Sequence, residues 1–157
     1  MIRSTVAALV LVVALPAMAV AQSKTNFSGT WNVDAAKSDP PPRGGGGAGA
    51  TAKLVITQTA LDMTVVVTTG RGDAKTTYKL DGSEMKESAA MGESRAKVSW
   101  DGPRLVVSRV QNVSTPQGAF EITSKETYSL SGGILTLVTT RNSPMGNTSR
   151  TTVFTKG

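Results

Sequence analysis

The sequence predicts an all-β domain, an antiparallel up-and-down meander of about eight to ten strands that closes into a barrel or a flattened clam. Apolar residues alternate with Thr, Ser and Lys at a spacing of two along most of the chain, which is typical of half-buried strands. Turn-forming residues such as Asp81-Gly82 and Ser131-Gly132-Gly133 separate the alternating runs. No window has the apolar spacing of an amphipathic helix. The periodicity therefore favours β-structure throughout.

The first element, residues 1–21, has the pattern of a cleavable export signal. A basic start is followed by an apolar core, Val6–Leu15, and by the small-x-small site Ala19–Ala21. The core is shorter than the roughly 20 residues that a membrane-spanning helix needs. We therefore expect cleavage before Gln22, a mature domain over residues 22–157, and a location in the bacterial periplasm or the medium. A retained membrane anchor is the less favoured alternative.

Runs of alternating residues are expected to form ten strands. They are Gly29–Asp34, Ala52–Thr59, Met63–Thr69, Lys75–Leu80, Glu84–Ala89, Arg95–Trp100, Arg104–Asn112, Phe120–Leu130, Ile134–Arg141 and Thr148–Thr155. Most connections between them are so short that they can join only antiparallel neighbours, so we expect consecutive hairpins. Closing such a meander removes exposed sheet edges, whereas a two-sheet sandwich, the alternative, usually needs Greek-key returns.

The segment 39–51 interrupts this meander after the first predicted strand. After Asp39 it has three consecutive prolines and Arg43, and it continues into a glycine-rich tract, Gly44–Gly49. A polyproline run is stiff and a glycine run is flexible. Neither a Lys-Ser/Thr pair nor a helix start follows, so we do not expect a phosphate-binding loop. We expect a flexible connector, with a mobile flap across one end of the barrel as the alternative.

Composition excludes most catalytic and metal chemistry. The chain has no histidine and no cysteine, which rules out a disulfide, a thiolate nucleophile, a Cys/His zinc site and the cysteine that anchors a bacterial lipoprotein. Asp81 and Asp101 lie beside predicted turns, where turn capping accounts for them, and the serines lack both a histidine base and a Gly-x-Ser-x-Gly motif. We therefore expect no enzymatic activity, no metal and no cofactor.

The charge balance is basic. Seventeen Lys and Arg residues stand against eleven Asp and Glu residues, a formal net charge of +6. The basic residues are spread singly along the chain, without interleaved aromatic residues for base stacking. We therefore expect a solvated basic surface and no nucleic-acid partner.

The stretch from Phe27 to Val33, Phe-Ser-Gly-Thr-Trp-Asn-Val, resembles the opening of the calycin barrels, the lipocalins and the fatty-acid-binding proteins. In those families a Gly-x-Trp motif lies on the first strand. The resemblance implies that Trp31 closes one end of the barrel and that an arginine of the last strand packs over it. Arg150 lies on the last predicted strand and corresponds to that arginine in role.

The mature chain as a whole resembles small secreted lipocalin-like proteins of environmental bacteria. The shared motifs include Lys37-Ser38-Asp39 before the Pro/Gly-rich segment, Leu54–Thr59, Thr77–Gly82 and Trp100-Asp101-Gly102. This resemblance implies the fold and no particular activity. The chain departs from the related families in having no lipocalin disulfide and in carrying a Pro/Gly-rich segment where fatty-acid-binding proteins have a helical lid.

Alternation also indicates which polar residues face inward. On one predicted strand Arg109 shares the face of Leu105 and Val107, and on the next Glu126 and Tyr128 lie on the apolar face. We expect Arg109, Glu126 and Tyr128 to form a polar cluster in an apolar lumen, which is how a pocket fixes one charged group of a ligand. Two alternatives are an internal ion pair that satisfies itself and an Arg109 that faces water.

Two functions remain open at this point. The first is an exported, soluble barrel that binds a small, mostly apolar molecule, with Trp31, Arg109, Glu126 and Tyr128 as ligand-binding residues. The second is a structural or protein-interaction module of the cell envelope, with a filled barrel and no ligand. A continuous cavity of about 300–1,000 Å³ would favour the first function.

Overall fold

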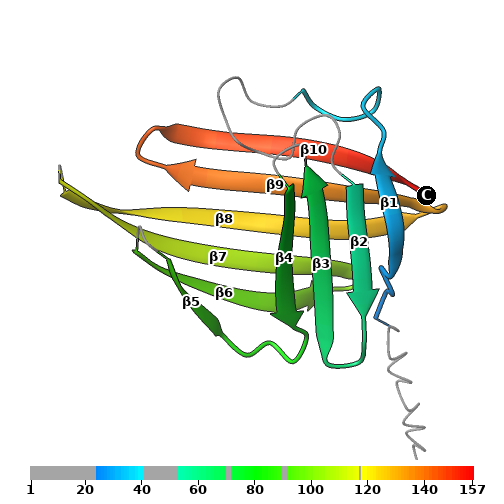
Figure 1. Ribbon diagram of the computed structural model, residues 1–157, viewed down its shortest axis with the longest axis horizontal. Coiled ribbons are helices and arrows are strands. Elements are labelled where there is room, and N and C mark those ends of the chain that lie inside the picture. Colours follow the sequence, from blue (N-terminus) through cyan, green and yellow to red (C-terminus); the bar gives the residue numbers. More distant parts are fainter. Residues whose placement is uncertain (1–23, 41–52, 70–71, 90–91, 117) are drawn as a thin grey trace, which may run out of the picture.

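A computed structural model describes residues 24–40, 53–69, 72–89, 92–116 and 118–157. Ten strands form one antiparallel sheet (Figure 1). They are β1 (Gly29–Val33), β2 (Lys53–Gln58), β3 (Asp62–Thr69), β4 (Gly72–Lys79), β5 (Met85–Ala89), β6 (Gly92–Asp101), β7 (Arg104–Thr115), β8 (Gly118–Ser131), β9 (Ile134–Ser143) and β10 (Gly146–Lys156). The predicted all-β meander is confirmed, and every predicted strand overlaps one of these. The predicted signal segment and most of the Pro/Gly-rich segment lie outside the described residues.

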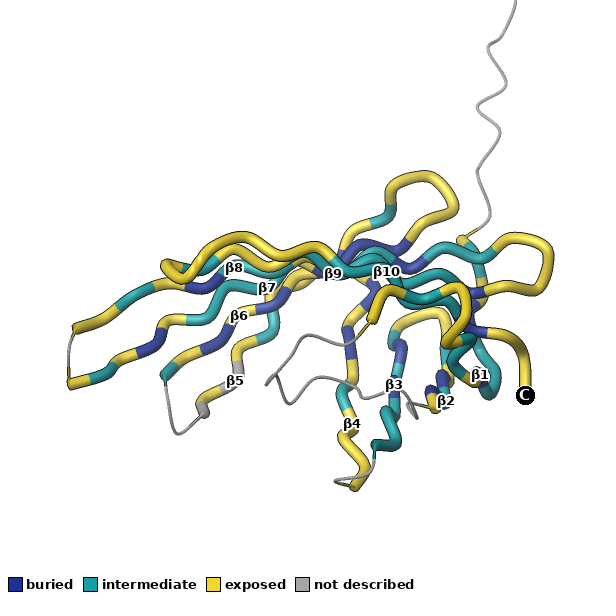
Figure 2. The backbone as a smooth tube through the Cα atoms, turned by 90° about the horizontal axis from the view of Figure 1, so that it is seen from above, coloured by how far each residue is buried: buried dark blue, intermediate teal, exposed yellow. Residues whose placement is uncertain are grey.

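The sheet curls into a nearly closed barrel, and the first and last strands of the chain, β1 and β10, pair in the middle of the sheet. The strand order is β4-β3-β2-β1-β10-β9-β8-β7-β6-β5, with Trp31 of β1 opposite Lys156 of β10 and Val33 opposite Phe154. Figure 2 shows β2–β4 and β5–β8 as two arms of the folded sheet. Of the closures expected from the sequence, the structure therefore has the barrel and not the sandwich.

One predicted hairpin is absent. The pair Asp81-Gly82 predicts a hairpin turn, but β4 and β5 lie at the two ends of the strand order and do not pair. The physical reason lies in Leu80, which is buried in the core rather than placed at the tip of a turn. The chain therefore crosses the end of the barrel here, and Asp81 Oδ1 accepts hydrogen bonds from the backbone N–H and the hydroxyl of Ser83, at 2.8 and 2.6 Å.

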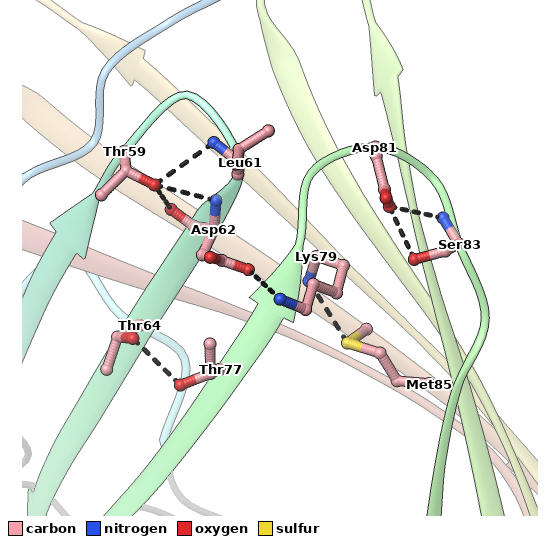
Figure 3. A network of polar contacts seen from close by, with 9 residues as sticks. All are labelled: Thr59, Leu61, Asp62, Thr64, Thr77, Lys79, Asp81, Ser83 and Met85. Carbon is pink, nitrogen blue, oxygen red and sulfur yellow. Dashed lines mark hydrogen bonds and ion pairs between the residues drawn. The ribbon is translucent and has the colours of Figure 1, made fainter.

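Side-chain contacts hold this junction between β4 and β5 (Figure 3). Lys79 Nζ pairs with Asp62 Oδ1 at 2.8 Å on the neighbouring strand β3. The backbone N–H of Lys79 points to Met85 Sδ at 3.2 Å, which links the end of β4 to the start of β5. At this end the two strands are thus linked by the contact between Lys79 and Met85 instead of a backbone ladder.

The apolar core fills one end of the barrel, which we call the closed end. Phe27, Trp31, Met63, Leu105 and Leu135 are at most 2% exposed. Burial alternates along most of the strands, as the dark blue segments of Figure 2 show. The described part of the chain contains no helix that is long and apolar enough to cross a membrane.

Beyond β1 the chain continues along the edge of β10. Asp34 N donates to the Val153 carbonyl at 2.8 Å, and Asp39 N donates to the Thr151 carbonyl at 2.9 Å. Ser38 Oγ accepts a hydrogen bond from Val153 N at 2.9 Å. These bonds replace the strand partner that β10 loses where β1 ends, and they bring Asp39 to the opposite, open end of the barrel.

Candidate ligand-binding site

A cavity of about 920 Å³ lies inside the barrel, above the closed end. One part of the cavity wall is apolar, and the residues that form this part come from four strands. They are Leu54, Val65, Val67, Leu137 and Phe154. Cavities of about 300–1,000 Å³ with mostly apolar walls and a few placed polar groups are typical of small-molecule sites. The interior therefore has both the room and the lining for a small ligand.

The register of β7 to β10 arranges the inward residues in rows that cross the sheet. From the open end inward, the rows are Arg109, Ser124, Arg141 and Thr148; then Val107, Glu126, Thr139 and Arg150; then Leu105, Tyr128, Leu137 and Thr152. Arginines occur only in the first two of these rows, and the third is mostly apolar. The interior thus becomes less polar toward the closed end.

Arg109, Glu126 and Tyr128 all line the cavity. The hydroxyl of Tyr128 donates to Glu126 Oε2 at 3.1 Å, and the hydroxyl of Tyr78 donates to the same oxygen at 3.4 Å. Arg109 Nη2 donates to Tyr78 Oη at 3.4 Å. The structure therefore brings the three predicted residues together, with Tyr78 as the link between Arg109 and Glu126.

Tyr78 was not predicted as a site residue. Alternation along its strand does place it on the same face as Met63 of the paired strand β3, so its inward orientation could have been found. It lies 48 residues before Glu126 in the sequence, and alternation within strands does not show which strands meet across a lumen. The contact depends on the curl of the whole sheet.

Burial controls the ionisation of Tyr128. The side chain is enclosed by the core, and this desolvation raises the pKa of its hydroxyl well above the usual value; the negative charge of Glu126 raises the pKa further, while Arg109 opposes the shift. Tyr128 therefore keeps its proton at neutral pH and acts as a hydrogen-bond donor to Glu126.

Trp31 lies beneath the cavity rather than on its wall. The indole is 2% exposed, and its Nε1 donates to the Phe27 carbonyl at 2.9 Å. The neighbouring core residues Leu54 and Phe154 form the surface that faces the cavity. Trp31, predicted as a ligand-binding residue, thus does not line the cavity. It lies in the packed core of the closed end, where a residue that closes the barrel is expected.

The structure does not place Arg150 over Trp31. The residue of β10 opposite Trp31 is Lys156, and Arg150 lies six residues earlier, a distance of about 20 Å along a strand. Arg150 lines the cavity, and its Nε donates to the Asp39 carbonyl at 3.4 Å. The expectation is wrong because the pairing register of β1 and β10 cannot be deduced from alternation. Lys156 is the cation beside Trp31.

Among the residues that the structure describes, no three His, Cys, Asp or Glu side chains are grouped so that they could hold a metal ion. The described ion pairs lie on the surface, and they join Lys37 to Asp34, Lys79 to Asp62, Arg95 to Glu93 and Arg104 to Asp101. The polar groups of the cavity therefore belong to a separate network.

Solved structures with the same fold were found at low sequence identity. The zebrafish ileal bile acid-binding protein, complexed with cholic acid, has a TM-score of 0.56 and 17% identity, covering 83% of this chain and 98% of its own. Human cRBP IV has a TM-score of 0.56 and 16% identity, with coverage of 85% and 99%. An SAHS protein of Ramazzottius varieornatus has a TM-score of 0.58 and 14% identity, with coverage of 87% and 98%.

The fold is that of the lipocalin and fatty-acid-binding-protein barrels. No protein-family model matches the chain, and no curated protein sequence matches it. At these identities the structural likeness establishes the architecture, and the function has to be argued from the residues of the cavity.

Proposed function

We propose that this chain is an exported, soluble barrel that binds a small, mostly apolar molecule in its lumen. The observation that carries the proposal is the cavity of about 920 Å³, with an apolar wall and one polar network. The alternative of an envelope module with a filled barrel does not fit a cavity of this size. Similar folds include a bile acid-binding protein and a protein described as a fatty acid transporter, which supports a binding role and not an enzymatic one.

Binding is tested with N-phenyl-1-naphthylamine, an apolar dye whose fluorescence rises in an apolar site. The full mature chain should bind it saturably. Val67 and Thr139 face the lumen from two walls, so the double variant Val67→Trp/Thr139→Trp should weaken dye binding at least about tenfold by occupying the site. Dye that binds equally well to this variant would contradict lumenal binding.

The matched control places the same bulk outside. Val66 and Thr140 are the neighbours of Val67 and Thr139 on the same strands, and successive residues of a strand point to opposite faces. The variant Val66→Trp/Thr140→Trp should keep the dye affinity of the unchanged protein. Circular dichroism of both variants shows whether each retains its β-structure.

Export is supported by the signal pattern of residues 1–21, and the absence of cysteine from the chain supports a form without a lipid anchor. The full chain is expressed in a Gram-negative host with its own leader, and the protein in the periplasm and medium is sequenced from its N-terminus. Gln22 is the expected first residue. Protein that stays in the cytoplasm with Met1 intact would contradict the proposal.

A further inference from the structure

Glu126 places a carboxylate on the wall of a cavity that is apolar near the closed end and carries Arg109, Arg141 and Arg150 toward the open end. Its two oxygens are used differently. Oε2 accepts the hydroxyl protons of both Tyr78 and Tyr128, whereas Oε1 makes no hydrogen bond to any residue that the structure describes. Two hydroxyl donors that converge on one oxygen indicate a carboxylate that acts only as an acceptor. Oε1 is therefore left as an acceptor on a residue that lines the cavity.

No direct ion pair neutralises this carboxylate within the described part of the chain. The nearest cation of the network, Arg109, donates to Tyr78 Oη and not to Glu126. Arg150 shares the row of Glu126 but lies two strands away, beyond Thr139. A second carboxylate brought close to Glu126 would therefore meet a like charge, and in a partly desolvated interior that repulsion is strong.

The donors around Glu126 are also committed. The hydroxyls of Tyr78 and Tyr128 both lie within hydrogen-bond distance of Oε2, so each already has an acceptor in the protein. A ligand at this place finds an acceptor, Glu126 Oε1, that has no hydrogen-bond partner among the described residues. A ligand group that donates to this oxygen adds a hydrogen bond that the described residues alone do not make.

We propose that the cavity selects an apolar molecule that carries a hydroxyl group, and that this hydroxyl donates a hydrogen bond to Glu126 Oε1. The inference rests on the proposed lumenal binding. It assigns Glu126 as the residue that determines specificity, with Tyr78 and Tyr128 as positioning residues that hold its other oxygen. An ether of the same shape lacks the donor, and the corresponding carboxylate brings the wrong charge.

The test compares three probes with the same apolar tail: 1-dodecanol, its methyl ether 1-methoxydodecane, and dodecanoate. Each displaces N-phenyl-1-naphthylamine from the full mature chain at pH 7.5. Dodecanol should bind at least about tenfold more tightly than the ether, because a site that accepts a hydroxyl proton discriminates against the analogue that lacks it. Dodecanol should also bind more tightly than dodecanoate.

Variants at Glu126 assign the preference to this residue. In Glu126→Leu the ratio between dodecanol and the ether should fall close to one, and Glu126→Gln, which keeps the shape but not the charge, should improve the binding of dodecanoate relative to dodecanol. Glu121→Leu is the control, because Glu121 lies on the same strand but is exposed on the outside. It should leave both ratios unchanged.

The outcomes separate this inference from the proposed function. Dye that Val67→Trp/Thr139→Trp binds as well as the unchanged protein does would overturn both, whereas dye that none of the three probes displaces would overturn the hydroxyl assignment. Equal displacement by dodecanol and the ether in the unchanged protein would overturn the hydroxyl assignment and leave lumenal binding intact, and this result does not depend on whether any variant folds. Tighter binding of dodecanoate than of dodecanol would show that the arginines of the open end define the polar group of the ligand.

Discussion

Tyr128 combines packing and polarity in a single side chain. It is 2% exposed, and its ring lies 6.2 Å from that of Phe27, centroid to centroid. Its hydroxyl reaches the cavity network through Glu126. Both the donor role and the raised pKa of this hydroxyl follow from the same enclosure.

The raised pKa of Tyr128 predicts a loss of stability at alkaline pH. An unfolded tyrosine titrates near pH 10, so below about pH 10 both states hold the proton and the stabilising contribution is complete. As the pH rises through the higher pKa of the folded state, the unfolded state loses the proton first, and this contribution disappears. The free energy of unfolding in urea should therefore fall more steeply with pH above 10 in the unchanged protein than in Tyr128→Phe.

Comparison of the two proteins cancels the effect of the lysines, which titrate in the same range in both. Absorbance of phenolate at 295 nm reports the ionisation directly. Parallel stability curves for the two proteins between pH 9 and 11 would mean that Tyr128 ionises as freely in the folded state as in the unfolded chain.

The two tryptophans should differ in their contribution to stability. Trp31 is almost fully enclosed and its Nε1 is hydrogen-bonded, so Trp31→Ala should lower the free energy of unfolding by about 3–5 kcal/mol. Trp100 is only half-buried, and its Nε1 has no hydrogen-bond partner among the described residues, so Trp100→Ala should cost less. Denaturant unfolding of both variants checks the order. Equal losses would refute the role of Trp31 as the plug of the closed end.

At the scale of elements, alternation in the sequence was enough to locate all ten strands but not their ends. The sequence predicts starts at Arg95, Phe120 and Thr148, whereas β6, β8 and β10 start earlier, each on a glycine with positive φ. Glycine is locally a turn residue, and only the hydrogen bonds to a neighbouring strand make it part of a ladder. Those partners are far away in the sequence and leave no local signal.

Gly92 is the glycine whose small size matters most. A Cβ at Gly92 would lie 1.8 Å from the Asn112 carbonyl oxygen of β7, and its φ is +133°. Gly92→Ala should therefore both strain its own backbone and push β6 away from β7. Overpacking of this kind costs about 1–3 kcal/mol, in addition to the cost of the positive φ.

Gly146→Ala is the matched control, because Gly146 has φ +120° but nothing within 4 Å of an added Cβ. Gly146→Ala should lose only the stability that the strained backbone at positive φ costs. Urea unfolding of both variants gives the difference, and a Gly146→Ala variant as unstable as Gly92→Ala would show that contact with β7 is not the cause.

On the scale of the whole molecule, the sequence predicts the inward faces but not the space that they enclose. Arg109, Glu126 and Tyr128 could be assigned to inward faces from alternation on two adjacent strands. Their contact with Tyr78, the shift of Arg150 away from Trp31 and the volume of the cavity all depend on register and curl, which are properties of the assembled sheet.

Because the cavity exists only in the folded barrel, ligand binding should stabilise the whole molecule. At a free concentration about 100 times its Kd, a ligand that binds only the folded state raises the free energy of unfolding by about 2.7 kcal/mol. Urea unfolding with and without dodecanol measures this shift, and Val67→Trp/Thr139→Trp should show much less of it. An unchanged midpoint at saturating dodecanol would contradict binding in the lumen.

The barrel is built like a split ring. Its backbone ladders run from β4 round to β5 without interruption, and the Lys79 amide contacts the Met85 sulfur between these two end strands. The circumference can therefore widen or narrow at this one place while every ladder stays intact. A barrel with a continuous ladder would have to break backbone hydrogen bonds to admit a bulkier ligand, whereas this barrel can open between β4 and β5 without breaking any ladder.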